Sequence, residues 1–240
     1  MGFPRLSAFL STVSLAGLLA LSGCVASPPA HFYQLQQGNP ALPEDNRGVA
    51  VLLGPLQVAD YLKRESVVQR QLDGNLSVSR EARWAGSLED DIARLLLRQL
   101  AARLDSSRLA LYPDRIGFKP EVQVLLNIDR LDSGPQQAAV LEAQWRLLDA
   151  QGQMRGSRVV RLERPHTGSM VNQLRVQSEL LQELAGLIAE AVKAMPVSAA
   201  APAATPARPR PQPRRSAPPS AEPRIPVVSP AAGAGEVYRF

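Results

Sequence analysis

The chain has 240 residues, a formal net charge of +5 and a single cysteine, so no intramolecular disulfide can form. His31 and His166 are its only histidines, which leaves little material for a metal site or a Ser-His-Asp triad. Six arginines against two acids give residues 196–240 a charge of +4, so the body is nearly neutral and indicates no nucleic-acid partner.

The N-terminus has the pattern of a secretory signal peptide. Arg5 provides a positive charge before the apolar stretch from Leu6 to Leu21, and two small residues follow this stretch. The stretch is shorter than the roughly 20 residues that a stable membrane span needs. We therefore expect residues 1–23 to be a signal peptide that is removed.

The four residues around the expected cleavage point resemble the bacterial lipobox, in which a branched apolar residue and two small residues precede a cysteine. These residues are Leu21, Ser22, Gly23 and Cys24. The resemblance implies that the Cys24 thiol receives diacylglycerol and that its freed amino group is acylated. Val25 stands where an Asp would favour retention in the inner membrane. In a Gram-negative host, this predicts a lipid anchor in the outer membrane, facing the periplasm.

The mature chain is expected to begin with a lipidated tether, residues 24–30, and to continue into several β segments. The pattern predicts β segments at residues 32–35, 49–58, 66–71 and 75–81. The second segment is apolar on both faces, as in a central strand. Asp73-Gly74 separates the last two and is typical of a hairpin turn.

Two amphipathic helices are predicted. Ser87 is a suitable N-cap, and Asp90 completes a capping-box pattern for a helix that ends near Leu104. A longer helix is expected from Ser169 to about Met195, where Pro196 stops it.

The region between the helices predicts further strands. They are expected at residues 108–112, 121–130, 140–149 and 157–163, and the last three form a β-meander. The order predicts an α+β domain over residues 31–195, in which two helices cover one face of a mostly antiparallel sheet. The Pro/Ala/Arg-rich tail of residues 196–240 is expected to be disordered, either as a soluble spacer or as a segment that attracts anionic polymers or headgroups.

No catalytic, metal or cofactor motif stands out, so an enzyme is not expected. The acidic run at residues 89–91 is explained by its place in the first turn of a helix. Trp84 and Trp145 lie in or beside predicted strands. Either tryptophan could line a groove for acyl chains or a partner, but packing in the core is the favoured interpretation.

Several segments together resemble the auxiliary lipoproteins of ABC-type envelope transporters, the group that contains paraquat-inducible protein C. The similarity rests on the lipobox followed closely by residues 32–35, on residues 51–62, on residues 83–88 before the first helix, and on the order of meander and final helix. It covers residues 24–195 and contains no catalytic motif. The basic tail departs from the compact pattern of the group.

This resemblance implies a non-enzymatic part of an MCE-type system that moves lipids between the two membranes and supports membrane integrity. The implied partners are an inner-membrane permease and a periplasmic MCE-domain protein, which the lipoprotein would dock at the outer membrane. Self-association of the chain is left open. The alternative is an assembly lipoprotein of the pilotin kind, or a cell-wall tether that uses the basic tail.

Overall fold

Three long antiparallel strands form a meander in the computed structural model, which describes residues 29–114 and 116–195. The strands are β6 (Val122–Gly134), β7 (Gln137–Asp149) and β8 (Met154–Arg164). Val124, Leu126 and Ile128 alternate with more exposed residues along β6 and are buried in the core. The predicted meander is therefore confirmed, although its strands are longer than the alternating pattern indicated.

A central strand, β2 (Val51–Val58), joins this meander and is parallel to both of its neighbours. These neighbours are β6 and the short strand β5 (Leu109–Leu111), so the sheet has the order β5-β2-β6-β7-β8. Val51, Leu52 and Leu53 are buried in succession, as expected for a strand covered on both faces.

A second, smaller sheet has the order β1-β4-β3. β3 (Ser66–Arg70) and β4 (Leu76–Trp84) form the predicted hairpin, and β1 (His31–Tyr33) pairs with β4 in parallel. The short helix η1 (Asp60–Leu62) connects β2 to β3 and was not predicted.

The α+β class is confirmed, while the strand pairing differs from one mostly antiparallel sheet. The described residues form two sheets, and both are mixed because β1 and β2 pair in parallel with their partners. Parallel pairs need long crossover connections, and the hairpin together with the first helix supplies that connection between β2 and β5.

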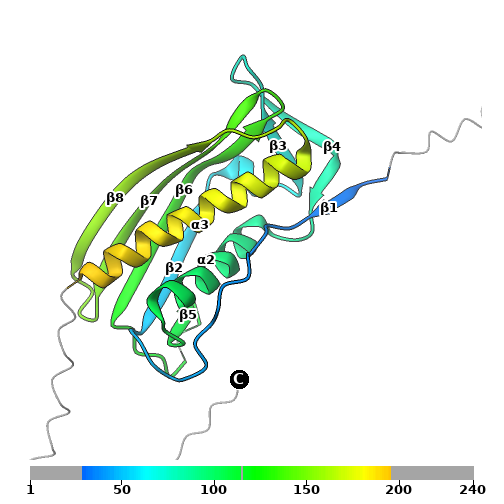
Figure 1. The fold of residues 1–240 in the computed structure, drawn as a ribbon. Coiled ribbons are helices and arrows are strands. Elements are labelled where there is room, and N and C mark those ends of the chain that lie inside the picture. Colours follow the sequence, from blue (N-terminus) through cyan, green and yellow to red (C-terminus); the bar gives the residue numbers. More distant parts are fainter. Residues whose placement is uncertain (1–28, 115, 196–240) are drawn as a thin grey trace, which may run out of the picture. The chain divides into compact units, whose positions relative to one another are not determined.

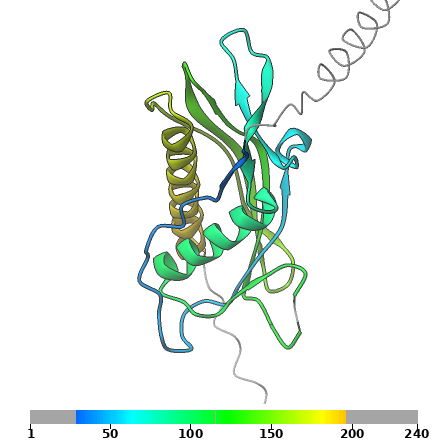
Figure 2. The same ribbon diagram turned by 90° about the vertical axis from the view of Figure 1, so that its right-hand side faces the viewer.

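Both helices cover the same face of the larger sheet (Figures 1 and 2). Helix α2 (Leu88–Leu104) packs on β2 and β5, and α3 (Met170–Ala194) packs on β6, β7 and β8. The side chains of Ser87 and Ser169 accept hydrogen bonds at the two helix N-termini, which confirms both predicted starts. Neither of these helices is long and apolar enough to cross a bilayer.

All the described residues belong to one compact unit. The predicted lipobox residues Leu21, Ser22 and Gly23, the lipidation site Cys24 and the sorting residue Val25 lie outside the described residues. The predicted tail, residues 196–240, lies outside them as well.

Candidate functional site

A groove of about 690 Å³ lies where the chain enters the small sheet from its N-terminal side. We call it the tether groove, and it is lined by Phe32 of β1, residues 63–65 after η1, and residues 83–89 from the end of β4 into α2. Phe32 is 66% exposed, and β1 is an edge strand with a single neighbour. An exposed aromatic ring beside an open groove is suited to contact with an apolar group.

The rim of the tether groove carries charges of both signs. Lys63 lies 2.7 Å from Asp60, and Arg83 lies 3.7 Å from Glu65, at exposed positions where such pairs stabilise little. The lining of the tether groove thus combines these charged groups with the apolar side chains of Phe32, Trp84 and Leu88, an arrangement suited to binding an amphipathic group. Among the described residues, no cluster of His, Cys, Asp and Glu could hold a metal ion.

The two tryptophans are both buried, as the favoured interpretation expected. Trp84 is 7% exposed and borders the tether groove, so it is the one that adjoins open space. Trp145 is 4% exposed and belongs to the core cluster, where its indole Nε1 has no hydrogen-bond partner. Contact with a partner or lipid is therefore retained as a proposal for Trp84.

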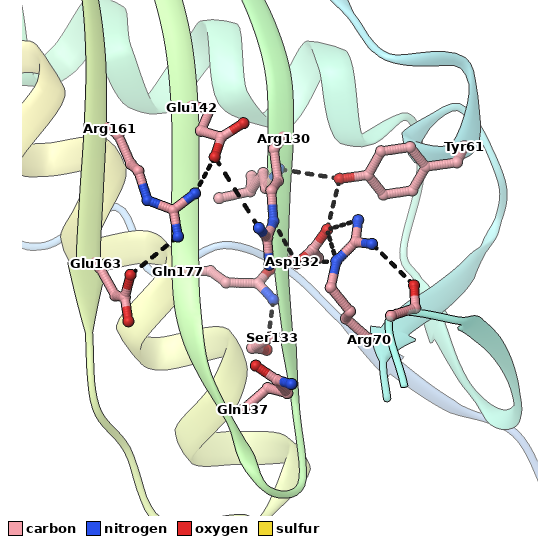
Figure 3. A network of polar contacts seen from close by, with 12 residues as sticks. Tyr61, Arg70, Arg130, Asp132, Ser133, Gln137, Glu142, Arg161, Glu163 and Gln177 are labelled. Carbon is pink, nitrogen blue, oxygen red and sulfur yellow. Dashed lines mark hydrogen bonds and ion pairs between the residues drawn. The ribbon is translucent and has the colours of Figure 1, made fainter. Parts of the chain in front are cut away.

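The most elaborate polar arrangement surrounds Asp132, a fully buried residue near the end of β6 (Figure 3). Arg70 of β3 donates from Nη2 to Asp132 Oδ2 at 2.7 Å, and Arg130 donates from Nε to Oδ1 at 2.9 Å. The Tyr61 hydroxyl donates to Oδ2 at 2.9 Å and accepts from the Leu131 backbone N–H at 3.2 Å. One carboxylate thus binds groups from η1, β3 and β6.

A second set of contacts joins the same strands to α3. Ser133 Oγ donates to Gln173 Oε1 at 3.2 Å and accepts from Gln177 Nε2 at 2.8 Å. Gln69 of β3 donates to the same Gln173 oxygen at 2.9 Å. Because both sets include β3 and β6, together they hold the small sheet in one position against the larger sheet and α3.

The network continues onto the sheet face that the helices leave open. Arg130 Nη1 lies 4.0 Å from Glu142 Oε1, which also pairs with Arg161, and Arg161 lies 3.1 Å from Glu163 (Figure 3). These groups are more exposed than Asp132, so water screens them. The interactions that stabilise the fold most are therefore those of the buried Asp132 carboxylate.

Opposing effects act on the pKa of the Asp132 carboxyl. Burial raises it, but the hydrogen bonds from Arg70, Arg130 and Tyr61 outweigh burial, so the pKa lies below its ordinary value of 3.8. Burial and the charge of Asp132 raise the pKa of Tyr61, which keeps its hydroxyl protonated as a donor.

This lowered pKa predicts how stability depends on pH. The carboxyl binds fewer protons in the folded chain than in the unfolded chain, so its contribution is fully present above the unfolded pKa of about 3.9. We expect the contribution to be lost as the pH falls through the lower, folded pKa. Urea denaturation at neutral pH, pH 5 and pH 3 checks this. Equal losses in the native chain and in Asp132→Asn below pH 4 would contradict the assignment.

The model of the ABC-type transport auxiliary lipoprotein component matches residues 33–189, which is nearly the whole described body. The chain belongs to this family. Residues 33–189 of this auxiliary lipoprotein include β2 to β8, α2 and most of α3. The matched region therefore contains Asp132 and all the groups from η1, β3 and β6 that bind it, which we call the Asp132 network.

Solved structures agree on the fold. An uncharacterized protein is similar over 68% of this chain and 99% of its own, at 21% identity and a TM-score of 0.55. A protein of family DUF330 from Xanthomonas campestris is similar over 68% of this chain and 97% of its own, at 18% identity and a TM-score of 0.54. No curated protein matches the chain.

The sequence interpretation did not identify the members of the Asp132 network. Tyr61, Arg70 and Asp132 are separated by up to 71 residues, and each alone resembles an ordinary exposed polar residue. The available signal was the run Asp132-Ser133-Gly134, three small or polar residues that extend an apolar strand before Pro135.

Proposed function

We propose that this auxiliary lipoprotein is a non-enzymatic subunit of an MCE/ABC-type system for lipid transport across the envelope, in which it supports membrane integrity. It docks the periplasmic MCE component at the outer membrane, and the inner-membrane permease lies at the other end of the system. The observation that carries the proposal is the family match, which covers the body almost from β1 to the end of α3.

The proposal divides the chain into four parts. Residues 1–23 direct export, lipids on Cys24 and the tether of residues 24–30 hold the protein, and residues 31–195 make the protein contacts. Residues 196–240 form a basic extension. The tether groove supports this division, because its apolar lining residues Trp84 and Phe32 lie beside β1, the first strand after the tether.

The anchor has a direct test. Each buried CH₂ of a lipid chain contributes about 0.8 kcal/mol, so two or three chains make release from a bilayer very slow. We expect radiolabelled palmitate to enter the native chain and Cys24→Ser to carry no label and leave the membrane fraction. Ser22→Ala, which keeps a small residue before the cysteine, is the matched control. An unlabelled native chain would rule out the anchor.

Docking is tested by crosslinking in the native envelope followed by mass spectrometry. The expected result is an adduct between the described body and an MCE-domain protein, reduced when Cys24→Ser releases the chain from the membrane. Deletion of the chain is expected to weaken the outer-membrane barrier. A weakened barrier with no crosslink to an MCE protein under any condition would count against docking. Adducts with a secretion-channel protein would favour a pilotin-like role.

A further inference from the structure

The tip of the β3–β4 hairpin exposes three large apolar side chains. We define the hairpin tip as Leu72, Leu76 and Val78, which are 68%, 40% and 49% exposed. Leu72 lies in the turn itself, which closes through a hydrogen bond from the Gly74 N–H to the Gln71 carbonyl at 2.9 Å. Leu76 and Val78 are two residues apart on β4 and share one face of the hairpin. Apolar groups gathered on a projecting element mark a contact surface.

The hairpin tip is held in a defined position. Figure 2 shows the hairpin projecting from the body, and Arg70, the last residue of β3 and two residues before Leu72, binds Asp132 of β6. The Arg70 Nη1 also donates to the Gly74 carbonyl at 3.1 Å, so the same guanidinium braces the turn. The apolar side chains are therefore presented by a rigid support.

The chain also enters the body at this small sheet. His31 of β1 is paired with Ala82 of β4, only four residues beyond Val78. Seven residue steps separate Cys24 from His31, and at 3.3–3.6 Å each they reach about 25 Å at most. Four strand residues span about 13 Å. A lipid anchor at Cys24 would thus keep the β1–β4 pair close to the membrane. The hairpin tip could then reach that membrane.

The opposite end of the body, formed by the C-terminal end of α3 and the β7–β8 turn, lies far from the small sheet. Helix α3 has 25 residues, about 37 Å at 1.5 Å per residue, and it ends beside the β7–β8 turn (Figure 1). This turn lies at the other end of the larger sheet from the hairpin. The two ends are far enough apart that only one can touch a flat surface beside the anchor.

We propose that the hairpin tip inserts into the interfacial region of the membrane that holds the Cys24 lipids, and so orients the body with the end of α3 away from that membrane. The inference rests on the proposed anchoring at Cys24. The proposed contact with the membrane is apolar and not electrostatic. The segment from Asp60 to Trp84, both included, contains five basic and four acidic residues, and Arg70 is neutralised by Asp132, so no net charge attracts anionic headgroups.

Depth-dependent fluorescence quenching tests the inference on the full lipidated chain. Leu72→Cys and the matched control Met154→Cys, which replaces a 63% exposed residue beside the β7–β8 turn, each receive one fluorophore. The acylated Cys24 thiol does not react with the label. The labelled chains are reconstituted into phosphatidylethanolamine–phosphatidylglycerol vesicles whose acyl chains are brominated near the headgroup.

Since interfacial segments bury their apolar side about 5–10 Å deep, we expect quenching at position 72 to exceed that at position 154 by about twofold or more. Concentrated salt should leave the difference unchanged, and adding Leu76→Asp and Val78→Asp should abolish it. Equal quenching at both positions, or a difference that salt removes, would overturn the inference.

Mass spectrometry of the N-terminal peptide separates this failure from failure of the anchor. A diacylglyceryl Cys24 combined with equal quenching rejects the membrane contact and leaves the proposed function intact. An unmodified Cys24 rejects the anchor and, with it, the orientation.

Discussion

Asp132→Asn is expected to lower the free energy of unfolding by about 3 kcal/mol, equivalent to about 6–12 °C in the melting temperature. The substitution keeps the shape of the side chain but removes the charge that compensates Arg70 and Arg130. It also turns an amide NH₂ toward a guanidinium that has only donors to offer. The estimate lies at the lower end for a broken buried pair because water still reaches both arginines, which are 23% and 19% exposed.

Urea denaturation followed by tryptophan fluorescence measures this loss, because Trp84 and Trp145 are both buried. The Cys24→Ser background removes the lipid from the measurement. Asp129→Asn is the matched control, since Asp129 lies on the same strand but is exposed, and a change within about 0.5 kcal/mol is expected. If both variants unfolded at the same urea concentration, Asp132 would have no special role in stability.

A double-mutant cycle assigns the loss to its partners. Arg70→Gln alone leaves the buried carboxylate with Arg130 and Tyr61, whereas in Arg70→Gln with Asp132→Asn neither the carboxylate nor its main partner remains charged. We expect the double variant to be more stable than the sum of the single losses predicts, by about 1–3 kcal/mol. Additive losses would show that Arg70 and Asp132 act independently.

Local patterns predicted those elements whose cause is local. The Ser87 cap and the apolar stripe of α2 determine one helix, and alternation together with tight turns determines β7 and β8. The Asp73-Gly74 hairpin follows from the same local rules, and the two buried faces of β2 follow from its continuous apolar run.

The rest depends on contacts between distant segments. Alternation along β6 is interrupted by an irregularity between Ile128 and Arg130, so the pattern stops predicting a strand while the strand itself continues to Gly134. Asp132 is buried there only because Arg70 and Tyr61 arrive from far earlier in the chain. A single sequence does not reveal such a contact between residues that are distant in the chain. The tether groove was missed for a related reason, since it forms where β1, η1 and α2 converge.

Gly134→Ala is expected to destabilise the protein by about 3–5 kcal/mol, a large effect for one added methyl group. A Cβ at this position would lie 1.9 Å from the Arg70 carbonyl oxygen, which belongs to the backbone and cannot swing aside as a side chain would. To relieve the overlap, β3 must move away from β6. That movement would also lengthen the bonds from Arg70 and Gln69 that hold the small sheet in place.

Gly156→Ala provides the matched control in the same sheet. Its added Cβ would meet only side-chain atoms of Trp145 and Leu147, at 3.9 and 4.0 Å. Within a strand, alanine is more stable than glycine by about 0.5–1 kcal/mol. We therefore expect Gly156→Ala to be neutral or slightly stabilising. Because the clash at Gly134 displaces Arg70 at the turn end of β3, Gly134→Ala should also reduce the quenching difference between positions 72 and 154. A destabilised variant that kept the full difference would show that the hairpin tip reaches the membrane without support from β6.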